Sequence, residues 1–462
     1  MIPEESATFG RVIRTAGILT AGRQLGAVVL TGAVLLLPRY LGGADLDRFL
    51  WIYFAQLLLS SILNLGLERY TAREVAGRER DRRPAALGTG LVGRALTALL
   101  TPLALVVLLG FVDVKLSATT FAAASVWTLA VQFQGVLFAG VRAAGRGSAE
   151  AGLILAGRVA QAILLLVGAI AGWGLAPLVW VLAAADVAVT FGSVIVADAV
   201  VGVGRPDGIP YRRLGLYTAL EISVFAYLRA DLLIVGRILG SNDGATYGLA
   251  YRVIDALVAL STPALLILFA YASGESARGQ GLERVRRRSQ SLLPQLGVVV
   301  AALGIVLVAP LARFVPRLHD IAPALRILLG TVPLTYLIGV EAHLLSAEDR
   351  NKPVLLVAMA ALVGNVLLNI GLVPSYAFMG AAVALLITEL GQVLGLTIGA
   401  NAPGARSAAS RVIPAVALLI LGGALFNVDV AIAAGAALVG AIVIAGVQIR
   451  SGLAPDAVEG SR

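Results

Sequence analysis

The stretch RYLGGAD, residues 39–45, joins two long apolar segments, and the stretch RILGSND, residues 237–243, joins two others. Both follow the pattern Arg-x-Leu-Gly-small-x-Asp, and the offset that aligns them also aligns Tyr53 with Tyr251. Glycine and aspartate favour tight turns on their own, but the shared arginine, leucine and distant tyrosine favour duplication of a longer unit. The sequence therefore predicts two similar halves.

The composition is that of a polytopic membrane protein. Of the 462 residues, 59% are hydrophobic and 14% are charged, whereas soluble domains have about 25% charged residues. Cysteine is absent and only two histidines occur, His319 and His343, so we expect no catalytic thiol and no bound metal or cofactor. The net charge of +9 needs no nucleic-acid partner, because arginines collect at one face of membrane proteins for topological reasons.

Fourteen segments approach or reach the length of about 20 apolar residues that a membrane-spanning helix needs. They lie near 11–37, 48–67, 85–112, 117–141, 149–172, 175–201, 214–238, 244–272, 291–313, 321–346, 352–373, 378–400, 411–427 and 430–450. The runs are unbroken rather than alternating, which excludes a transmembrane β-barrel. The predicted fold class is an all-α polytopic membrane protein with about 14 transmembrane helices.

Charge in the connections predicts the orientation. The connections after even-numbered spans carry most of the basic residues, namely Arg69, Arg73, Arg78, Arg80, Arg82, Arg83, Arg142, Arg146, Arg205, Arg212, Arg213, Arg278, Arg284, Arg286, Arg287, Arg288, Arg350, Lys352, Arg406 and Arg411. Basic residues near membrane helices mark the cytoplasmic side. We therefore expect both termini in the cytoplasm and the chain in the cell membrane. The longest loop, residues 273–290, contains ERVRRRSQ and is predicted to be a solvated segment near anionic headgroups.

The two matching junctions follow spans one and seven, so an even number of crossings separates them. Such parallel repeats are related by a pseudo-two-fold axis along the membrane normal, and the substrate path lies between them. We predict an N-lobe of six spans at 1–201, a cytoplasmic linker at 202–213 and a C-lobe of six spans at 214–400. Residues 401–462 would add two C-terminal spans and a cytoplasmic tail.

Ionisable residues inside the spans are informative, because an ionised side chain at the bilayer centre costs about 2.5–3.5 kcal/mol. The predicted spans contain Arg23, Arg94, Arg158, Asp186, Glu221, Arg229, Asp231, Arg252, Asp255, Arg326, Glu341, His343 and Glu389. Arg94 and Arg326 lie within two turns of a membrane face, where snorkelling explains them. Glu341 and His343 lie near the cytoplasmic end of their span.

Arg23 is the strongest candidate for lining a substrate path, because its own helix holds no acidic neighbour in the membrane. Arg252 and Asp255 are three residues apart and can pair on one helical face, as a structural or a functional ion pair. A guanidinium binds phosphate in bidentate fashion and keeps its charge when desolvated. A mid-membrane arginine therefore implies a nearby anion, either a carboxylate or a substrate phosphate.

Two classes of function lack their motifs. An ATP-driven pump needs a Lys-Ser or Lys-Thr pair in a Gly-rich loop, but Lys115 precedes Leu116 and Lys352 precedes Pro353. The predicted outer loops are too short to hold a catalytic segment. We therefore expect a protein that is not an enzyme.

Three stretches carry a family resemblance: NLGLERYTARE at 64–74, RADLLIVGRILGSNDGATYGLAYRVIDAL at 229–257, and GNVLLNIGLVPSYAFMGAAVALLITE at 364–389. They resemble the second, the seventh to eighth, and the eleventh to twelfth helices of polysaccharide flippases in the multidrug/oligosaccharidyl-lipid/polysaccharide (MOP) exporter superfamily. The resemblance spans the first twelve predicted helices.

The resemblance implies two lobes that open alternately to each side of the membrane. The cargo would be a polyprenyl-diphosphate-linked oligosaccharide, moved from the cytoplasmic to the outer leaflet through a central cationic cavity. Relatives line this cavity with cations on the first two helices of each lobe, positions held here by Arg23, Arg229 and Arg252; Arg158 is a fourth candidate. Expected partners are membrane lipids, a polysaccharide polymerase and glycosyltransferases.

A proton or sodium gradient would supply the energy, and the candidate coupling or gating residues are Asp231, Asp186, Glu221, Glu389 and Asp255. Asp231 matches the family position, although a salt bridge that holds one conformer together would explain it equally. Asn365 and Asn369 share a helical face and are expected to pack between helices.

Three alternatives remain. A lipid II-type flippase for cell-wall precursor shares the count of fourteen spans. A cation-coupled multidrug antiporter shares the architecture but would favour acidic and aromatic residues in its cavity. An enzyme or a non-transporting scaffold is the third.

Overall fold

The computed structural model describes residues 4–208, 229–262, 282–348 and 350–399, with isolated positions within 215–227, 264–272 and 413–417. These ranges contain helices and no strand. The helices are α1 Glu4–Leu36, α2 Gly43–Ile62, α3 Leu67–Gly77, α4 Arg83–Ala98, α5 Thr101–Phe111, α6 Ala118–Ala143, α7 Gly147–Ile170, α8 Leu175–Val200, α10 Ala230–Ile238, α11 Ser241–Ala259, α13 Glu283–Phe314, α14 Arg317–Ala347 and α15 Asn351–Leu394. The predicted all-α class is confirmed.

Seven of the helices are long and apolar enough to cross a membrane, and up to nine spans result if each of two bent pairs counts as one. The bent pairs are α2 with α3, at 48°, and α4 with α5, at 44°. α15 covers two of the predicted spans. They are two helices joined at a kink, where the backbone of Ala377 leaves the helical conformation with φ at 46°. The chain is thus a multi-pass membrane protein. Its predicted last two spans lie almost wholly outside the described residues.

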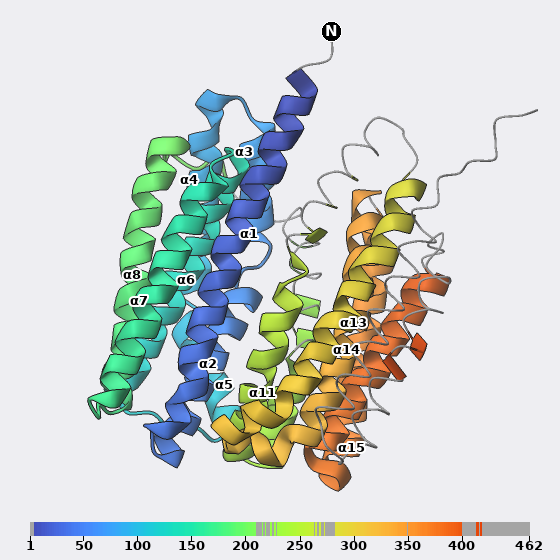
Figure 1. The fold of residues 1–462 in the computed structure, drawn as a ribbon. Coiled ribbons are helices and arrows are strands. Elements are labelled where there is room, and N and C mark those ends of the chain that lie inside the picture. The colour runs from blue at the N-terminus through green and yellow to red at the C-terminus, as the bar shows by residue number, and fades with distance from the viewer. Residues whose placement is uncertain are drawn as a thin grey trace, which may run out of the picture. The chain divides into compact units, whose positions relative to one another are not determined.

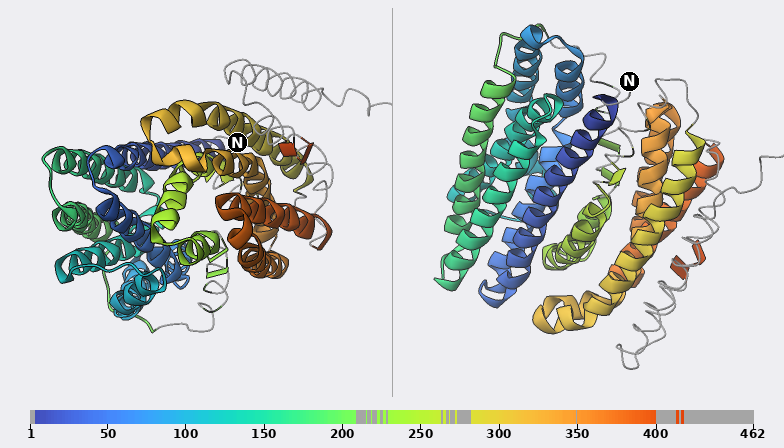
Figure 2. Two further views of the ribbon diagram at one scale, coloured as in Figure 1. Left: turned by 90° about the horizontal axis from the view of Figure 1, so that it is seen from below. Right: turned by 45° about the horizontal axis from the view of Figure 1, so that its top comes forward.

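The contacts divide the chain into two compact units, Met1–Arg252 and Val253–Arg462. Within the first unit, α1 packs on α7, α8 packs on both α6 and α7, and α3 packs on α4 and α6 (Figure 1). Within the second unit, α14 packs against both α13 and α15, as the views in Figure 2 also show. The predicted lobe boundaries at 201 and 214 remain predictions.

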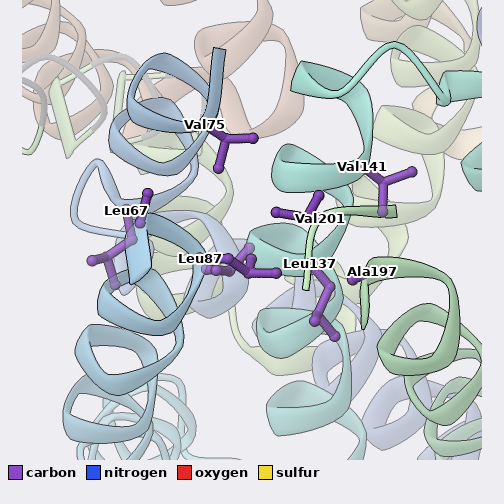
Figure 3. Close-up of a cluster of buried hydrophobic side chains, with 9 residues drawn as sticks. Leu67, Val75, Leu87, Leu137, Val141, Ala197 and Val201 are labelled. Atoms are coloured by element: carbon purple, nitrogen blue, oxygen red, sulfur yellow. The ribbon is translucent and has the colours of Figure 1, made fainter. Parts of the chain in front are cut away.

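An apolar cluster holds four helices of the first unit together at one end (Figure 3). Its labelled members are Leu67 and Val75 of α3, Leu87 of α4, Leu137 and Val141 of α6, Ala197 of α8, and Val201 directly after it. All are at most 6% exposed. Burial of this size in side chains from distant segments fixes the relative positions of α3, α4, α6 and α8.

The start of the predicted linker, residues 202–208, is docked on α4. The Gly204 amide donates to the Pro84 carbonyl at 3.0 Å, and the Asp207 amide donates to Thr89 Oγ1 at 3.0 Å. A Cβ on Gly88 would lie 2.0 Å from the Gly204 carbonyl oxygen, so only glycine allows this approach. The Asp207 carboxylate also pairs with Arg78. This part of the linker is therefore fixed to the first unit.

Arg94 closes the break between α2 and α3. Its Nη1 donates to the Leu63 carbonyl at 2.8 Å and its Nη2 donates to Asn64 Oδ1 at 2.6 Å. A bent helix frees backbone carbonyls that need new donors in an apolar medium. The side chain is fully buried, at 0% exposure, so the prediction that Arg94 snorkels to a membrane face is wrong.

The segment ERVRRRSQ was predicted to be solvated, which holds for Arg287 and Arg288 but is wrong for Arg286. Arg286 is 1% exposed and pairs with Glu341 at 3.1 Å and Glu348 at 2.6 Å. Of three consecutive residues on a helix, only one faces a given neighbour. In α13 that residue is Arg286, whose partners both project from α14 or its end.

Both matching junctions connect one helix to the next, as predicted. The second junction turns at Gly240, with φ at 107°, whereas Gly42 in the first has φ at −62°. The second also packs tightly on α2: Trp51 Nε1 donates to the Ser241 carbonyl at 2.8 Å. A Cβ on Gly236 or Gly244 would lie 2.4 or 2.5 Å from the Trp51 ring. The two glycines make the space that the indole fills.

This packing predicts that Gly244→Ala destabilises the protein by about 1–3 kcal/mol, because the added methyl group overlaps Trp51 and the Gly236 backbone. The matched control is Gly364→Ala in α15, where an added Cβ meets nothing within 4 Å and alanine favours the helix by up to about 1 kcal/mol. Thermal unfolding of the two purified variants in detergent measures the difference. Equal melting temperatures would contradict the prediction.

Candidate functional site

The candidate site begins where α1 and α7 pack closely. Gly22 and Gly26 lie four residues apart on α1, and a Cβ on each would lie 2.9 Å from Ala151 Cβ and 3.1 Å from Arg158 Cβ. Small residues at this spacing let two membrane helices approach. Arg23 directly follows the first glycine, so the close packing brings its guanidinium to the first turn of α7.

Four charged side chains from four helices meet there. We name Arg23, Glu68, Arg142 and Glu150 the Glu150 cluster. Glu150 Oε1 accepts from Arg23 Nη2 and from Arg142 Nη1, the second at 2.5 Å. Arg142 Nη2 also lies 4.0 Å from Glu68 Oε2.

The two arginines of the cluster face an accessible side, but the carboxylate between them does not. The side chain of Glu150 is 0% exposed, whereas those of Arg23 and Arg142 are 36% and 26% exposed. Arg23 was predicted as a site residue without an acidic partner in its own helix. Its partner comes from α7, more than a hundred residues away, and the sequence signal for it was an acid in the first turn of span five.

A second group surrounds Asp186 on α8. Its Oδ2 accepts from Trp127 Nε1 and Gln161 Nε2, each at 2.6 Å. Its Oδ1 accepts from Gln134 Nε2 at 3.1 Å, and Arg158 Nη1 lies 3.6 Å from Oδ2. Both carboxylate oxygens are thus hydrogen-bonded in the interior. The predicted site residues Arg158 and Asp186 are brought together.

Two arginines lie over the two tyrosines that the repeated motif aligns. The Arg252 guanidinium carbon lies 3.9 Å from the centre of the Tyr53 ring, and that of Arg229 lies 5.3 Å from the centre of the Tyr251 ring. A cation over an aromatic face at these distances is attracted to the ring. Tyr53 also meets Trp127 edge to face at 5.4 Å, so Arg252 is linked through two rings to the Asp186 group.

Asp231 lies buried beside the second of these tyrosines. Its Oδ2 accepts from Tyr247 at 3.0 Å and from Tyr251, and its Oδ1 accepts from the Leu232 amide at 2.8 Å. Five predicted residues therefore gather in two groups in the first unit. Arg158, Asp186 and Arg252 are linked through Trp127 and Tyr53, and Arg229 and Asp231 are linked through Tyr251. Trp127, Gln134 and Gln161, which surround Asp186, were not among the predicted site residues.

Most of the remaining predicted residues belong to the second unit. Glu389 of α15 accepts from the Thr335 hydroxyl at 2.8 and 3.0 Å. Asn369 Nδ2 donates to the Asn365 carbonyl and side chain, at 2.8 and 3.1 Å, so these bonds run along α15 rather than across helices. Asp255 lies on α11, and Glu221 lies outside the described residues. In the described part of the chain, no three or more His, Asp or Glu side chains gather as a metal site.

Comparison with known proteins identifies the fold but no family. No family model and no curated protein matches the chain. The lipid II flippase MurJ, in an inward closed conformation, superimposes with a TM-score of 0.72 at 11% identity, over 94% of this chain and 99% of that one. An inward-facing multidrug resistance MATE transporter of the MOP superfamily gives 0.62 at 14% identity, over 86% and 99%.

A third structure, a MOP superfamily transporter from Pyrococcus furiosus described by the reversed polarity of its binding pocket, gives a TM-score of 0.62 at 14% identity. It covers 88% of this chain and 96% of its own. These similarities extend over nearly the whole length of each chain. The protein thus has the polytopic fold of MOP superfamily transporters.

Proposed function

We propose that the protein is a flippase for a polyprenyl-diphosphate-linked oligosaccharide, which crosses from the cytoplasmic to the outer leaflet by alternating access through a central cationic cavity. The observation that carries the proposal is Arg23. This guanidinium lies inside a membrane helix, one-third exposed, and is held by a carboxylate that is fully buried. An intramembrane arginine marks a functional site by default, and the exposed edge has donors left for an anion.

The chemistry of the cargo suits these arginines. A guanidinium has five N–H donors in a planar fork that matches phosphate, and the Arg23 bond to Glu150 uses only its Nη2. Arg158 is 23% exposed, and the Arg252 guanidinium lies over the Tyr53 ring. With Arg229 they are the proposed contacts for the diphosphate. The saccharide would follow the diphosphate through the protein, while the prenyl tail stays in the bilayer.

A lipid II-type precursor is the second candidate cargo. The similarity to MurJ, at a TM-score of 0.72, exceeds that to the MATE transporter, at 0.62. Both proposed cargoes present a diphosphate on a prenyl chain, so the arginines fit either. A multidrug antiporter fits less well, since the hydrogen bonds on Asp186 leave little capacity to accept a cationic drug.

The remaining parts of the proposal follow the predicted topology. Both termini would lie in the cytoplasm, and the chain would work beside a polymerase and glycosyltransferases in the cell membrane. A proton or sodium gradient would act through Asp231, Asp186, Glu389, Asp255 or Glu221. Of these, Asp231 adjoins Arg229 through Tyr251, so a change in its charge would act directly on a proposed substrate contact.

We expect Arg23→Ala or Arg252→Ala to reduce export of the saccharide at least about tenfold, because each removes a charged hydrogen-bonding group worth about 1.5–3 kcal/mol. Export is measured as surface glycan, with the amount of protein in the membrane determined in parallel. The control is Arg287→Ala, since this arginine is 75% exposed and, within the described part of the chain, pairs along its own helix with Glu283. Normal export from both variants would refute the role of these arginines.

Deletion of the gene identifies the cargo. We expect a polyprenyl-diphosphate-linked oligosaccharide to accumulate on the cytoplasmic side, because synthesis continues while translocation stops. Extraction of the membrane lipids followed by mass spectrometry measures it, with the complemented strain as the control. Accumulation of lipid II would select the second cargo, and an unchanged lipid profile would reject both.

A further inference from the structure

We propose that Glu150 is an internal counter-ion that holds Arg23 and Arg142 until a substrate phosphate replaces it, and that these two arginines form a phosphate subsite. The inference rests on the proposed function and deepens it. It adds Arg142 to the proposed substrate contacts and gives Glu150 a positioning role.

Only one of the two carboxylate oxygens of Glu150 accepts hydrogen bonds from the described residues. Both arginines donate to Oε1, while Oε2 is buried and meets no donor among the described residues. Arg23 Nε is likewise buried without an acceptor there. A buried polar atom without a partner costs about 1–3 kcal/mol. The arrangement is therefore not one in which every group is satisfied, as a purely structural ion pair requires.

A buried carboxylate in the second unit has the opposite arrangement. Glu341 accepts from Arg286 on Oε2 at 3.1 Å and from Gln290 on Oε1 at 2.6 Å, so both of its oxygens are satisfied. Its arginine is 1% exposed and also bonds Glu348. No anion from outside can reach Arg286 without unpacking α13 from α14. The Arg286–Glu341 pair is thus a structural ion pair, and it serves as the matched control for Glu150.

Exposure decides which groups an incoming anion meets. Both arginines of the Glu150 cluster present a quarter to a third of their side chains, but Glu150 presents none. An anion on the accessible side therefore contacts the guanidinium edges and not the carboxylate. Arg23 and Arg142 share the buried carboxylate of Glu150. The other acidic residue of the cluster, Glu68, lies 4.0 Å from Arg142 and is one-third exposed.

The ligand that fits two adjacent guanidinium forks is a phosphate or diphosphate group. Bonds to phosphate oxygens would replace the single Glu150 bond on each arginine, so both arginines stay paired. Glu150 would take up a proton as it loses its donors, because burial disfavours an unpaired carboxylate. The return of Glu150 would then expel the phosphate after translocation. The counter-ion thus lowers affinity in favour of release, so its removal should tighten binding.

The test uses full-length protein in nanodiscs and measures binding of a polyprenyl diphosphate without sugar. We expect Glu150→Gln to bind it about five- to tenfold more tightly, since loss of one competing charge of about 1–1.4 kcal/mol corresponds to that factor, and to transport it more slowly. Arg142→Gln should bind it about five- to tenfold more weakly, since Glu150 then holds Arg23 alone. Glu341→Gln should bind like the wild type.

The competing probes identify the source of the phosphate. Soluble diphosphate should compete with the lipid-linked one, whereas phosphatidylglycerol should not. Equal competition by phosphatidylglycerol would overturn the assignment to substrate. No binding by the wild-type protein would refute the proposed function itself.

Wild-type binding with no tightening in a monodisperse Glu150→Gln protein would refute only the counter-ion. If Glu150→Gln does not yield monodisperse protein, the Arg142→Gln variant decides. Unchanged binding there overturns the inference, and weaker binding with an unchanged melting temperature supports it.

Discussion

The structure depends on one constraint: an ionised side chain among apolar helices must find a partner, because neither lipid nor hydrocarbon side chains can solvate it. Three arginines meet it in three ways. Arg94 donates to a backbone carbonyl and an amide at a helix break, Arg286 joins two carboxylates of α14 and its end, and Arg23 shares one carboxylate with Arg142. Each solution links separate helical segments, so the buried charges reinforce the packing of their helices.

Glycine allows the helices that carry these charges to pack closely. Helices in a membrane gain little from hydrophobic association, and small residues at their interface allow the packing that replaces it. Gly22 and Gly26 do this between α1 and α7, and Gly236 and Gly244 do it around Trp51. Without the first pair, the Arg23 side chain would not reach Glu150. The geometry of the ion cluster thus follows from two residues that have no side chain.

The fold class could be predicted from the sequence because hydropathy is a local property: each apolar run of sufficient length predicts a membrane-spanning helix. The repeated junction also pointed to Tyr53 and Tyr251, and each lies under an arginine. The partners of the buried charges were not predictable in the same way. Glu150 lies in the first turn of a helix, where acidic residues are common. The prediction for Arg94 assumed a straight span, but the span is bent. Arg286 is one of three consecutive arginines, which the sequence alone does not distinguish. Which distant segment supplies the partner of a buried charge is not encoded in the residues around that charge.

The number of hydrogen-bond donors around a buried carboxylate decides whether its arginine can leave it. Asp186 keeps three neutral donors even if Arg158 turns away, because Trp127, Gln161 and Gln134 remain bonded to it. Arg158 can therefore leave for an anionic ligand without stranding a bare carboxylate in the interior. Glu150 has no such reserve, since its donors are the two arginines themselves. In the first case the arginine can leave its carboxylate. In the second the arginines stay, the ligand replaces the carboxylate, and Glu150 becomes neutral by taking up a proton. A carrier of phosphorylated cargo needs both properties, one to follow the ligand and one to release it.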